Sequence, residues 1–231
     1  MVALAVLLGK RNHFGTDKQK NRVMIVSAFL IDGLELFKIW LLCYNSGNAE
    51  PILRTLPLFL CSIQLIAIPL AAFSSGRVKE ASLDFVCIFG ILGAVFGTIG
   101  AGQNYNAYPV LSFDNVVSGL THGISGFASL YILFAGLASM KKRNIGITFG
   151  ILLGFCGVAY IANVLIPYNY MFLMTPDGTP YEIFYNLVNG HPVLYPLIVV
   201  LLFVAYIIAF YGVFYIFSNK KQKASKLTKT V

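Results

Sequence analysis

Residues 193–223 read VLYPLIVVLLFVAYIIAFYGVFYIFSNKKQK. This stretch places an uncharged apolar run, residues 193–217, directly before a cluster of lysines. A helix needs about 20 apolar residues to cross a hydrocarbon core about 30 Å thick, so this run is long enough to span a membrane. Other apolar runs of similar length occur earlier in the chain, at residues 23–43, 53–73, 83–104, 115–139 and 145–166. We therefore predict an all-α, polytopic transmembrane helix bundle with six full spans.

The segments that join these runs alternate in charge. The basic segments are residues 9–22, 74–81 and 140–144 and the tail 218–231, which alone carries five lysines. The segments between them contain no Lys or Arg, and they are residues 44–52, 105–114 and 167–192. Cytoplasmic loops of membrane proteins carry an excess of Lys and Arg. The pattern predicts a multi-pass protein of the cell membrane whose basic loops and C-terminus are cytoplasmic.

The composition leaves no room for a second, soluble domain, because 58% of the residues are apolar and the mean hydropathy is +0.76. We predict one transmembrane helical domain, residues 1–217, followed by a basic tail. The net charge of +8 indicates attraction to anionic lipid of the inner leaflet, not to nucleic acid. The cysteines fall on four different predicted helices and form no CxxC pair, which argues against a disulfide framework or a zinc ribbon; they are Cys43, Cys61, Cys87 and Cys156.

The amino terminus, residues 1–8, is apolar but would reach only about 12 Å as a helix. It has no basic n-region and no small-residue cleavage site, so it does not resemble a signal peptide. We expect it to be the inner end of a partial helix, which an upstream start would complete as a seventh span.

Polar side chains inside the predicted spans are the candidates for a functional site, because such groups are costly in a bilayer and usually face the bundle interior. Cys61, His122 and Glu35 each lie about seven or eight residues from the outer end of their helix, or about 12 Å at 1.5 Å per residue. Asn163 lies near the outer end of its helix, and Gln103 and Asn104 end another. These groups converge on one layer in the outer half of the membrane.

Cys61 and His122 form a nucleophile and base in principle. A thiol in a medium of low dielectric stays protonated unless a base takes its proton, and a neutral imidazole can take it and later return it to a leaving group. Asn163, Asn169 and Tyr170 are candidate donors to a developing oxyanion. Glu35 is a candidate for orienting the imidazole.

Each of these residues also has a simpler interpretation. Cys61 can be a small apolar filler, and His122 can make an interhelical hydrogen bond. Glu35 has Lys38 three residues along the helix, so the two can form an ion pair. A metal site built from Cys61, His122, Glu35 and Asp32 lacks motif spacing, so we predict no metal and no soluble cofactor.

Three stretches carry a resemblance to a known family: LPLFLC at 56–61, SGLTHG at 118–123, and Asn163 followed by PYNYMFL at 167–173. Together they resemble the YwaF-like integral membrane proteins of bacteria, which are related to the eukaryotic transmembrane protein 164 acyltransferases. The resemblance covers roughly residues 20–217. It implies a seven-helix fold and a Cys/His pair that moves fatty acyl chains between phospholipids and lysophospholipids, matched here by Cys61 and His122. Where bacterial members often have a histidine two residues before this cysteine, the present chain has Phe59.

The sequence leaves three functions open. The first is a phospholipid/lysophospholipid acyltransferase, or a lipid hydrolase, with membrane phospholipids as partners and substrates. The second is a small-molecule or proton-coupled transporter in which Asp32, Glu35 and His122 line a pathway. The third is a non-catalytic membrane scaffold or lipid-binding protein, which would tolerate replacement of all these residues.

Overall fold

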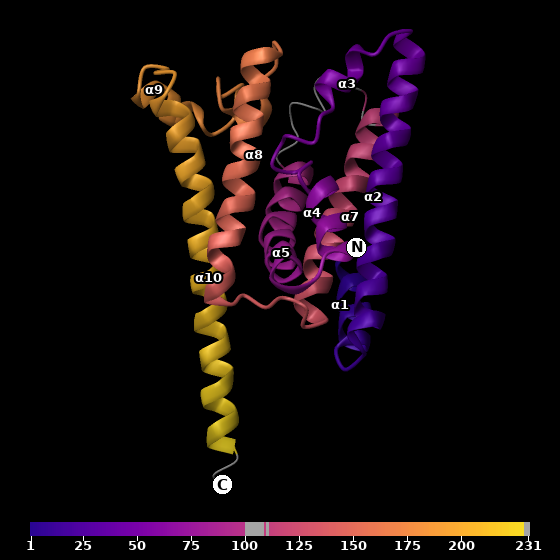
Figure 1. The fold of residues 1–231 in the computed structure, drawn as a ribbon, viewed down its shortest axis with the longest axis vertical. Coiled ribbons are helices and arrows are strands. Elements are labelled where there is room, and N and C mark those ends of the chain that lie inside the picture. The colour runs from indigo at the N-terminus through magenta and orange to yellow at the C-terminus, as the bar shows by residue number, and fades with distance from the viewer. Residues whose placement is uncertain (100–108, 110, 229–231) are drawn as a thin grey trace. The chain divides into compact units, whose positions relative to one another are not determined.

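The computed structural model describes residues 1–99, 109 and 111–228, and within these residues it contains helices and no strand. The predicted all-α class is confirmed. Residues 1–171 and residues 172–231 form two compact units, and we describe each by itself (Figure 1).

The described residues of the first unit form seven α-helices. They are α1 (Val2–Asn12), α2 (Asp17–Ser46), α3 (Glu50–Arg54), α4 (Gln64–Phe73), α5 (Gly76–Ile99), α7 (Phe113–Phe134) and α8 (Ile145–Leu165). A short 3-10 helix, η1 (Lys142–Asn144), precedes α8, and a second one, η2 (Tyr170–Phe172), lies at the boundary between the units. Helix α5 packs against α7 and α4, and α2 packs against α4 and α7.

Among the residues that the structure describes, four helices are long and apolar enough to cross a membrane: Gly76–Gly97, Phe113–Phe134, Lys142–Leu165 and Leu194–Ser218. Helix α2 has the length, at 30 residues, but Asp32, Glu35 and Lys38 lie within it. Helix α4 has only 10 residues. The count of six full spans therefore stays a prediction, whereas the described part of the chain contains four apolar helices of spanning length.

The continuous helix predicted at residues 53–73 is interrupted in the structure. Helix α3 ends at Arg54, residues 55–63 are non-helical, and α4 begins at Gln64. Pro57 explains the break, because proline disfavours the helical conformation of the preceding residue and has no N–H to donate. The interruption removes Cys61 from a helix and places it in a turn.

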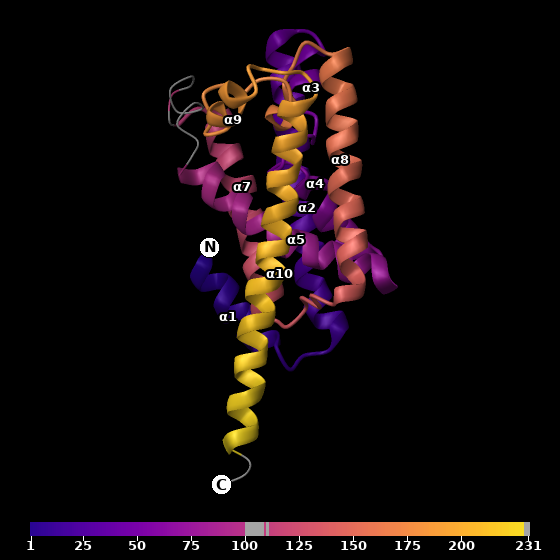
Figure 2. The ribbon, with the colours of Figure 1, turned by 90° about the vertical axis from the view of Figure 1, so that its left-hand side faces the viewer.

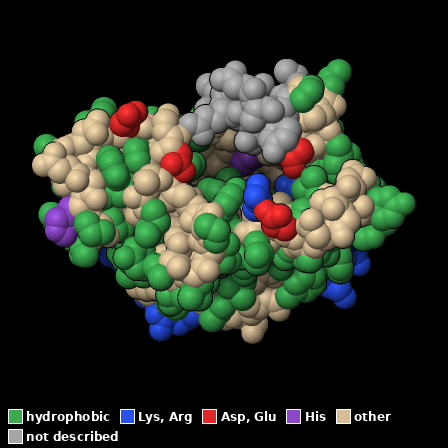
Figure 3. Space-filling model, turned by 90° about the horizontal axis from the view of Figure 1, so that it is seen from above, with side chains coloured by type: hydrophobic (Ala, Val, Ile, Leu, Met, Phe, Trp, Pro, Cys, Tyr) green, Lys and Arg blue, Asp and Glu red, His purple; other side chains and the backbone are tan. Residues whose placement is uncertain are grey.

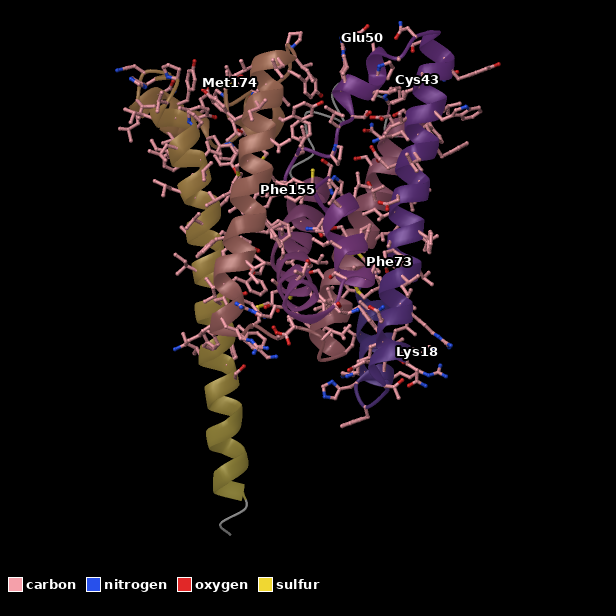
Figure 4. All side chains as sticks on the ribbon, in the orientation of Figure 1. Lys18, Cys43, Glu50, Phe73, Phe155 and Met174 are labelled. Atoms are coloured by element: carbon pink, nitrogen blue, oxygen red, sulfur yellow. The ribbon has the colours of Figure 1, made fainter. Side chains whose placement is uncertain are left out.

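Helix α2 has well-defined ends. Thr16 and Gln19 form a capping box at its start, where the Thr16 hydroxyl accepts from the Gln19 N–H and the Gln19 side chain accepts from the Thr16 N–H. Gly47 ends the helix with a left-handed φ of 67°. Figure 4 shows Lys18 at one end of α2 and Cys43 near the other, so the basic segment 9–22 and the segment 44–52, which has no Lys or Arg, lie at opposite ends of this helix.

Helices α5 and α7 approach each other closely through small residues. A Cβ added to Gly90 would lie 2.8 Å from Ser129 Cβ, and one added to Gly126 would lie 2.6 Å from Ala94 Cβ. The Ser129 hydroxyl donates to the Cys87 carbonyl across the same interface. These contacts need residues without bulky side chains, as in other tightly packed membrane helices.

Helix α7 ends at Phe134, before the predicted boundary at residue 139. Gly136 has a φ of 69°, which turns the chain away from the helix. The buried Asp84 carboxylate then accepts hydrogen bonds from the Ser139 N–H, the Ser139 hydroxyl and the Met140 N–H. Residues 139–140 are therefore held against α5 by Asp84 and cannot continue the helix.

The second unit contains α9 (Glu182–Leu187) and α10 (Leu194–Thr228). The helix α10 continues through residues 218–228, where a basic tail is predicted, as Figure 2 shows. Within this unit the Tyr181 ring packs edge-on to Phe203, and the Tyr185 ring packs edge-on to Tyr195. These aromatic pairs hold the segment around α9 against α10.

Candidate functional site

Cys61 lies in a tight turn immediately before α4. The Ser62 hydroxyl accepts from the Phe59 N–H at 3.0 Å and donates to the Phe59 carbonyl at 3.1 Å. The Ile63 N–H also donates to the Phe59 carbonyl, at 2.9 Å. The turn is therefore fixed by its own hydrogen bonds, and it presents Cys61 as a half-buried free thiol.

Phe59 connects this turn to the segment that follows α8. Its ring contacts Tyr168 and Tyr170, with centroids 6.0 and 5.3 Å away. The Asn163 amide donates to the Tyr170 carbonyl at 2.9 Å and accepts from the Tyr170 N–H at 2.6 Å. The Tyr170 hydroxyl donates to the Leu53 carbonyl, and burial raises the pKa of this phenol. The nitrogen and oxygen of the Asn163 amide and the Tyr170 hydroxyl thus all bind backbone groups. These two residues are among the predicted oxyanion donors.

Helix α5 brings Cys61 and His122 to one face. A Cβ added to Gly93 would lie 3.4 Å from Cys61 Cα and 3.5 Å from Cys61 Cβ. A Cβ added to Gly97 would overlap the imidazole ring of His122. Gly93 and Gly97 are one helical turn apart, about 6 Å along the axis. Cys61 and His122, which are 61 positions apart in sequence, therefore pack on adjacent turns of α5. We call the face of α5 that contains Gly93 and Gly97 the glycine face.

Helix α2 contributes an ion pair next to these two residues. Lys38 Nζ lies 2.7 Å from Glu35 Oε1, and each side chain is only 11% exposed. Both belong to the buried stripe of α2 that also contains Met24, Ala28 and Ile31. Lys38 is close enough to interact electrostatically with both Cys61 and His122. The predicted pairing of Glu35 with Lys38 is confirmed, and among the described residues no hydrogen bond joins Glu35 to His122.

In the view from above, a histidine side chain is visible in a recess of the surface, and Lys or Arg and acidic side chains are visible nearer the viewer (Figure 3). Gln103 and Asn104, which we expected in the same layer, lie outside the described residues. Asn169 is half-buried in the segment after α8. Within residues 1–99, 109 and 111–228, no group of three or more His, Cys, Asp or Glu side chains is placed to hold a metal ion.

Two polar residues near Cys61 are not indicated as site residues by the pattern of the sequence. One is Lys38, which the spacing predicts only as a partner for Glu35. The other is Gln64, the first residue of α4, which is fully buried. A signal for Gln64 was present, since it is an amide within the otherwise apolar stretch 63–70 and lies three positions after the cysteine.

Apolar helices of spanning length, with a thiol and an imidazole on one glycine face, define a multi-pass integral membrane protein with a polar site among its helices. The chain belongs to the TMEM164 family, whose family model matches residues 1–215. That range includes every candidate site residue, and it confirms the family resemblance found in the three short motifs. Among curated proteins and solved structures, none matches the chain significantly.

Proposed function

We propose that this protein transfers fatty acyl chains between phospholipids and lysophospholipids, with Cys61 as the nucleophile and His122 as the general base and acid. The observation that supports this most directly is the packing of both residues on Gly93 and Gly97 of α5. A nucleophile and a base must lie within reach of each other, and the glycine face provides the space for that approach.

The reaction needs no group from outside the lipid and the chain. His122 takes the Cys61 proton as the sulfur bonds to the acyl carbon of a phospholipid ester. The ester C–O bond breaks, and the lysophospholipid leaves with the proton from His122. The hydroxyl of a second lysophospholipid then attacks the thioester while His122 takes its proton, and the Cys61 sulfur leaves and recovers that proton. Water in place of the second lysophospholipid gives hydrolysis.

The break between α3 and α4 supports a site of this kind. Non-helical backbone at membrane depth is tolerated where it is buried in protein or lines a polar cavity. Residues 55–63 are non-helical and carry Cys61, and the buried Glu35–Lys38 pair lies nearby. Polar groups at this depth suit a lipid ester, whose carbonyl lies near the boundary of the hydrocarbon core.

The orientation of the site is part of the proposal. With the basic segments and the C-terminus on the cytoplasmic side, next to anionic lipid, the turn that carries Cys61 belongs to the outer half of the membrane. The substrates then reach Cys61 from the outer leaflet.

The test is acyl exchange by the purified protein in proteoliposomes. The vesicles contain a phospholipid with one isotopically labelled acyl chain and an unlabelled lysophospholipid, and mass spectrometry follows the label. We expect labelled chains on the acceptor and, after an acid quench, a labelled thioester on the peptide that contains Cys61. Vesicles without protein and vesicles without lysophospholipid separate transfer from background and from hydrolysis. Absence of both signals for all headgroups tested contradicts the proposal.

Gly97→Ala is expected to slow acyl exchange by about 10- to 100-fold with little loss of stability, because misplacing a catalytic group by about 1 Å has an effect of that size. The new Cβ overlaps the His122 ring, which must move away from its position on Gly97. Alanine itself favours a helix over glycine by about 0.5–1 kcal/mol. The exchange rate and the Tm in detergent are measured together.

Gly119→Ala is the matched control for Gly97→Ala, since a Cβ at this position in α7 would have no neighbouring atom within 4 Å among the described residues. We expect its exchange rate to equal that of the wild type. A Gly97→Ala variant that exchanges acyl chains at the wild-type rate would show that the position of the His122 ring does not matter.

A further inference from the structure

Gln64 follows Cys61 on the same side of the turn that leads into α4. Its N–H donates to the Cys61 carbonyl at 3.4 Å, and the next two N–H groups, of Leu65 and Ile66, also donate to carbonyls three residues back. This is the hydrogen-bond pattern of a 3-10 turn, in which side chains at positions i and i+3 are eclipsed. The side chains of Cys61 and Gln64 therefore leave the chain in the same direction.

The Gln64 amide is buried and has no hydrogen-bond partner in the part of the chain that the structure describes. The residue is 0% exposed, and among the described residues neither Oε1 nor Nε2 has a hydrogen-bond partner. An unsatisfied buried polar group of this kind destabilises the folded protein. The rest of the buried face of α4 is apolar and consists of Ala67, Ile68, Ala71 and Ala72. Folding alone therefore favours an apolar residue at position 64. The presence of an amide there indicates that it binds a ligand or takes part in a reaction.

Two of the residues that the sequence predicted as oxyanion donors, Asn163 and Tyr170, make hydrogen bonds to other groups. The Asn163 amide binds both backbone groups of Tyr170, and the Tyr170 hydroxyl donates to Leu53. Lys38 is paired with Glu35. Gln64 is a side-chain amide beside Cys61 whose N–H donors are uncommitted within the described residues.

We propose that the Gln64 side chain is a catalytic residue that donates a hydrogen bond from Nε2 to the carbonyl oxygen of the lipid ester attacked by Cys61. This inference rests on the proposed acyl transfer. As the S–C bond forms, the carbonyl π electrons move onto the oxygen, and the Gln64 N–H stabilises the negative charge there. When the C–O bond to the lysophospholipid breaks, the electrons return and the carbonyl reforms. A preorganised donor in a site shielded from water is worth more than the same donor in water.

The test compares two reactions of the same thiol in wild type and in Gln64→Met, which keeps the volume and removes the amide. Iodoacetamide alkylates Cys61 by displacing iodide and forms no oxyanion, whereas acylation of Cys61 by a labelled phospholipid does. We expect acylation to fall by about 10²- to 10³-fold, the usual effect of losing one oxyanion donor. Alkylation is expected to stay within about threefold, and the Tm to stay equal or rise because an unpaired buried amide is gone.

Ser82→Ala is the matched control. Ser82 is also fully buried, and its hydroxyl has no hydrogen-bond partner in the described part of the chain, but it lies 11 residues before Gly93 on α5. That separation is about 16 Å along the helix. We expect both reactions of Cys61 to proceed in this variant at wild-type rates.

Two results overturn the role of Gln64 while leaving acyl transfer intact. One is Gln64→Met acylation within threefold of the wild type, and the other is an equal fall in acylation and alkylation together with a lower Tm. A third result concerns the wild type, in which iodoacetamide alkylates Cys61 while no phospholipid acylates it. That result overturns the proposed function, and the role of Gln64 with it.

Discussion

Cys61→Ala is expected to reduce acyl exchange to the background of protein-free vesicles, and His122→Ala is expected to reduce it by about 10²- to 10⁴-fold. Without the Cys61 sulfur no thioester can form, and without the imidazole the thiol keeps its proton in a medium of low dielectric. Because the two residues act as a unit, the double variant should be no slower than Cys61→Ala alone. The exchange assay in proteoliposomes measures all three, with Tm as the check on folding.

Control variants for this pair are present in the chain. Cys43 is a half-buried thiol near the end of α2, and His191 is a histidine of the second unit that accepts hydrogen bonds from the N–H groups of Val193 and Leu194. Cys43→Ala and His191→Ala should exchange acyl chains at wild-type rates. Full acyl exchange by Cys61→Ala would contradict the proposed acyltransferase. If Glu35→Gln abolished the function of the protein while Cys61→Ser left it unaffected, that pattern would favour a transporter.

Lys38→Met is expected to destabilise the protein by about 3–5 kcal/mol, because it leaves the Glu35 carboxylate buried without its counter-ion. The two side chains are each 11% exposed and lie 2.7 Å apart, so little water can replace the ammonium. Replacing both residues, as in Glu35→Leu with Lys38→Met, should restore most of the stability, since a buried ion pair and a well-packed apolar pair are often equivalent. Reversible unfolding in detergent micelles gives the free energies of unfolding.

The chain also contains an exposed ion pair for comparison. Arg54 and Glu50 are paired in α3 with side chains 65% and 59% exposed. Arg54→Met should cost less than about 1 kcal/mol, as is usual for surface pairs. Equal losses for Lys38→Met and Arg54→Met would mean that Glu35 is solvated, and would remove the burial argument for this pair.

Many residues of the candidate site were predictable from the pattern of residue types. The way in which the helices bring these residues together was not. The spacing of Glu35 and Lys38 along one helix predicted their ion pair, because residues three positions apart lie on the same side of a helix. The depth of Cys61 and His122 in their runs indicated a shared layer. Depth did not indicate that both residues pack on Gly93 and Gly97. The depth of a residue in the membrane does not say which way its helix is rotated about its own axis.

The predicted span at 53–73 shows where the pattern of hydropathy fails. Apolar composition continues through residues 55–63, so a count of apolar residues gives one long helix. Pro57 and the hydrogen bonds of the Phe59–Ile63 turn override that count and leave Cys61 outside any helix. Gln64, three positions after the cysteine, lies on the same side as Cys61 in this turn, as it would in an unbroken helix. Its full burial, with no hydrogen-bond partner among the described residues, is known only from the structure.

The sequence by itself determined that this chain forms apolar helices in a membrane, and its motifs indicated the TMEM164 family, because span length and short motifs are local properties of the chain. Apart from the Glu35–Lys38 pair, which polar groups meet was decided only by the tertiary structure. Lys38 lies near Cys61 and His122, and Gln64 is buried with no hydrogen-bond partner among the described residues, because of how α2, α4, α5 and α7 rotate and pack. Contacts between segments far apart in sequence depend on these rotations, and no local pattern of residues encodes them.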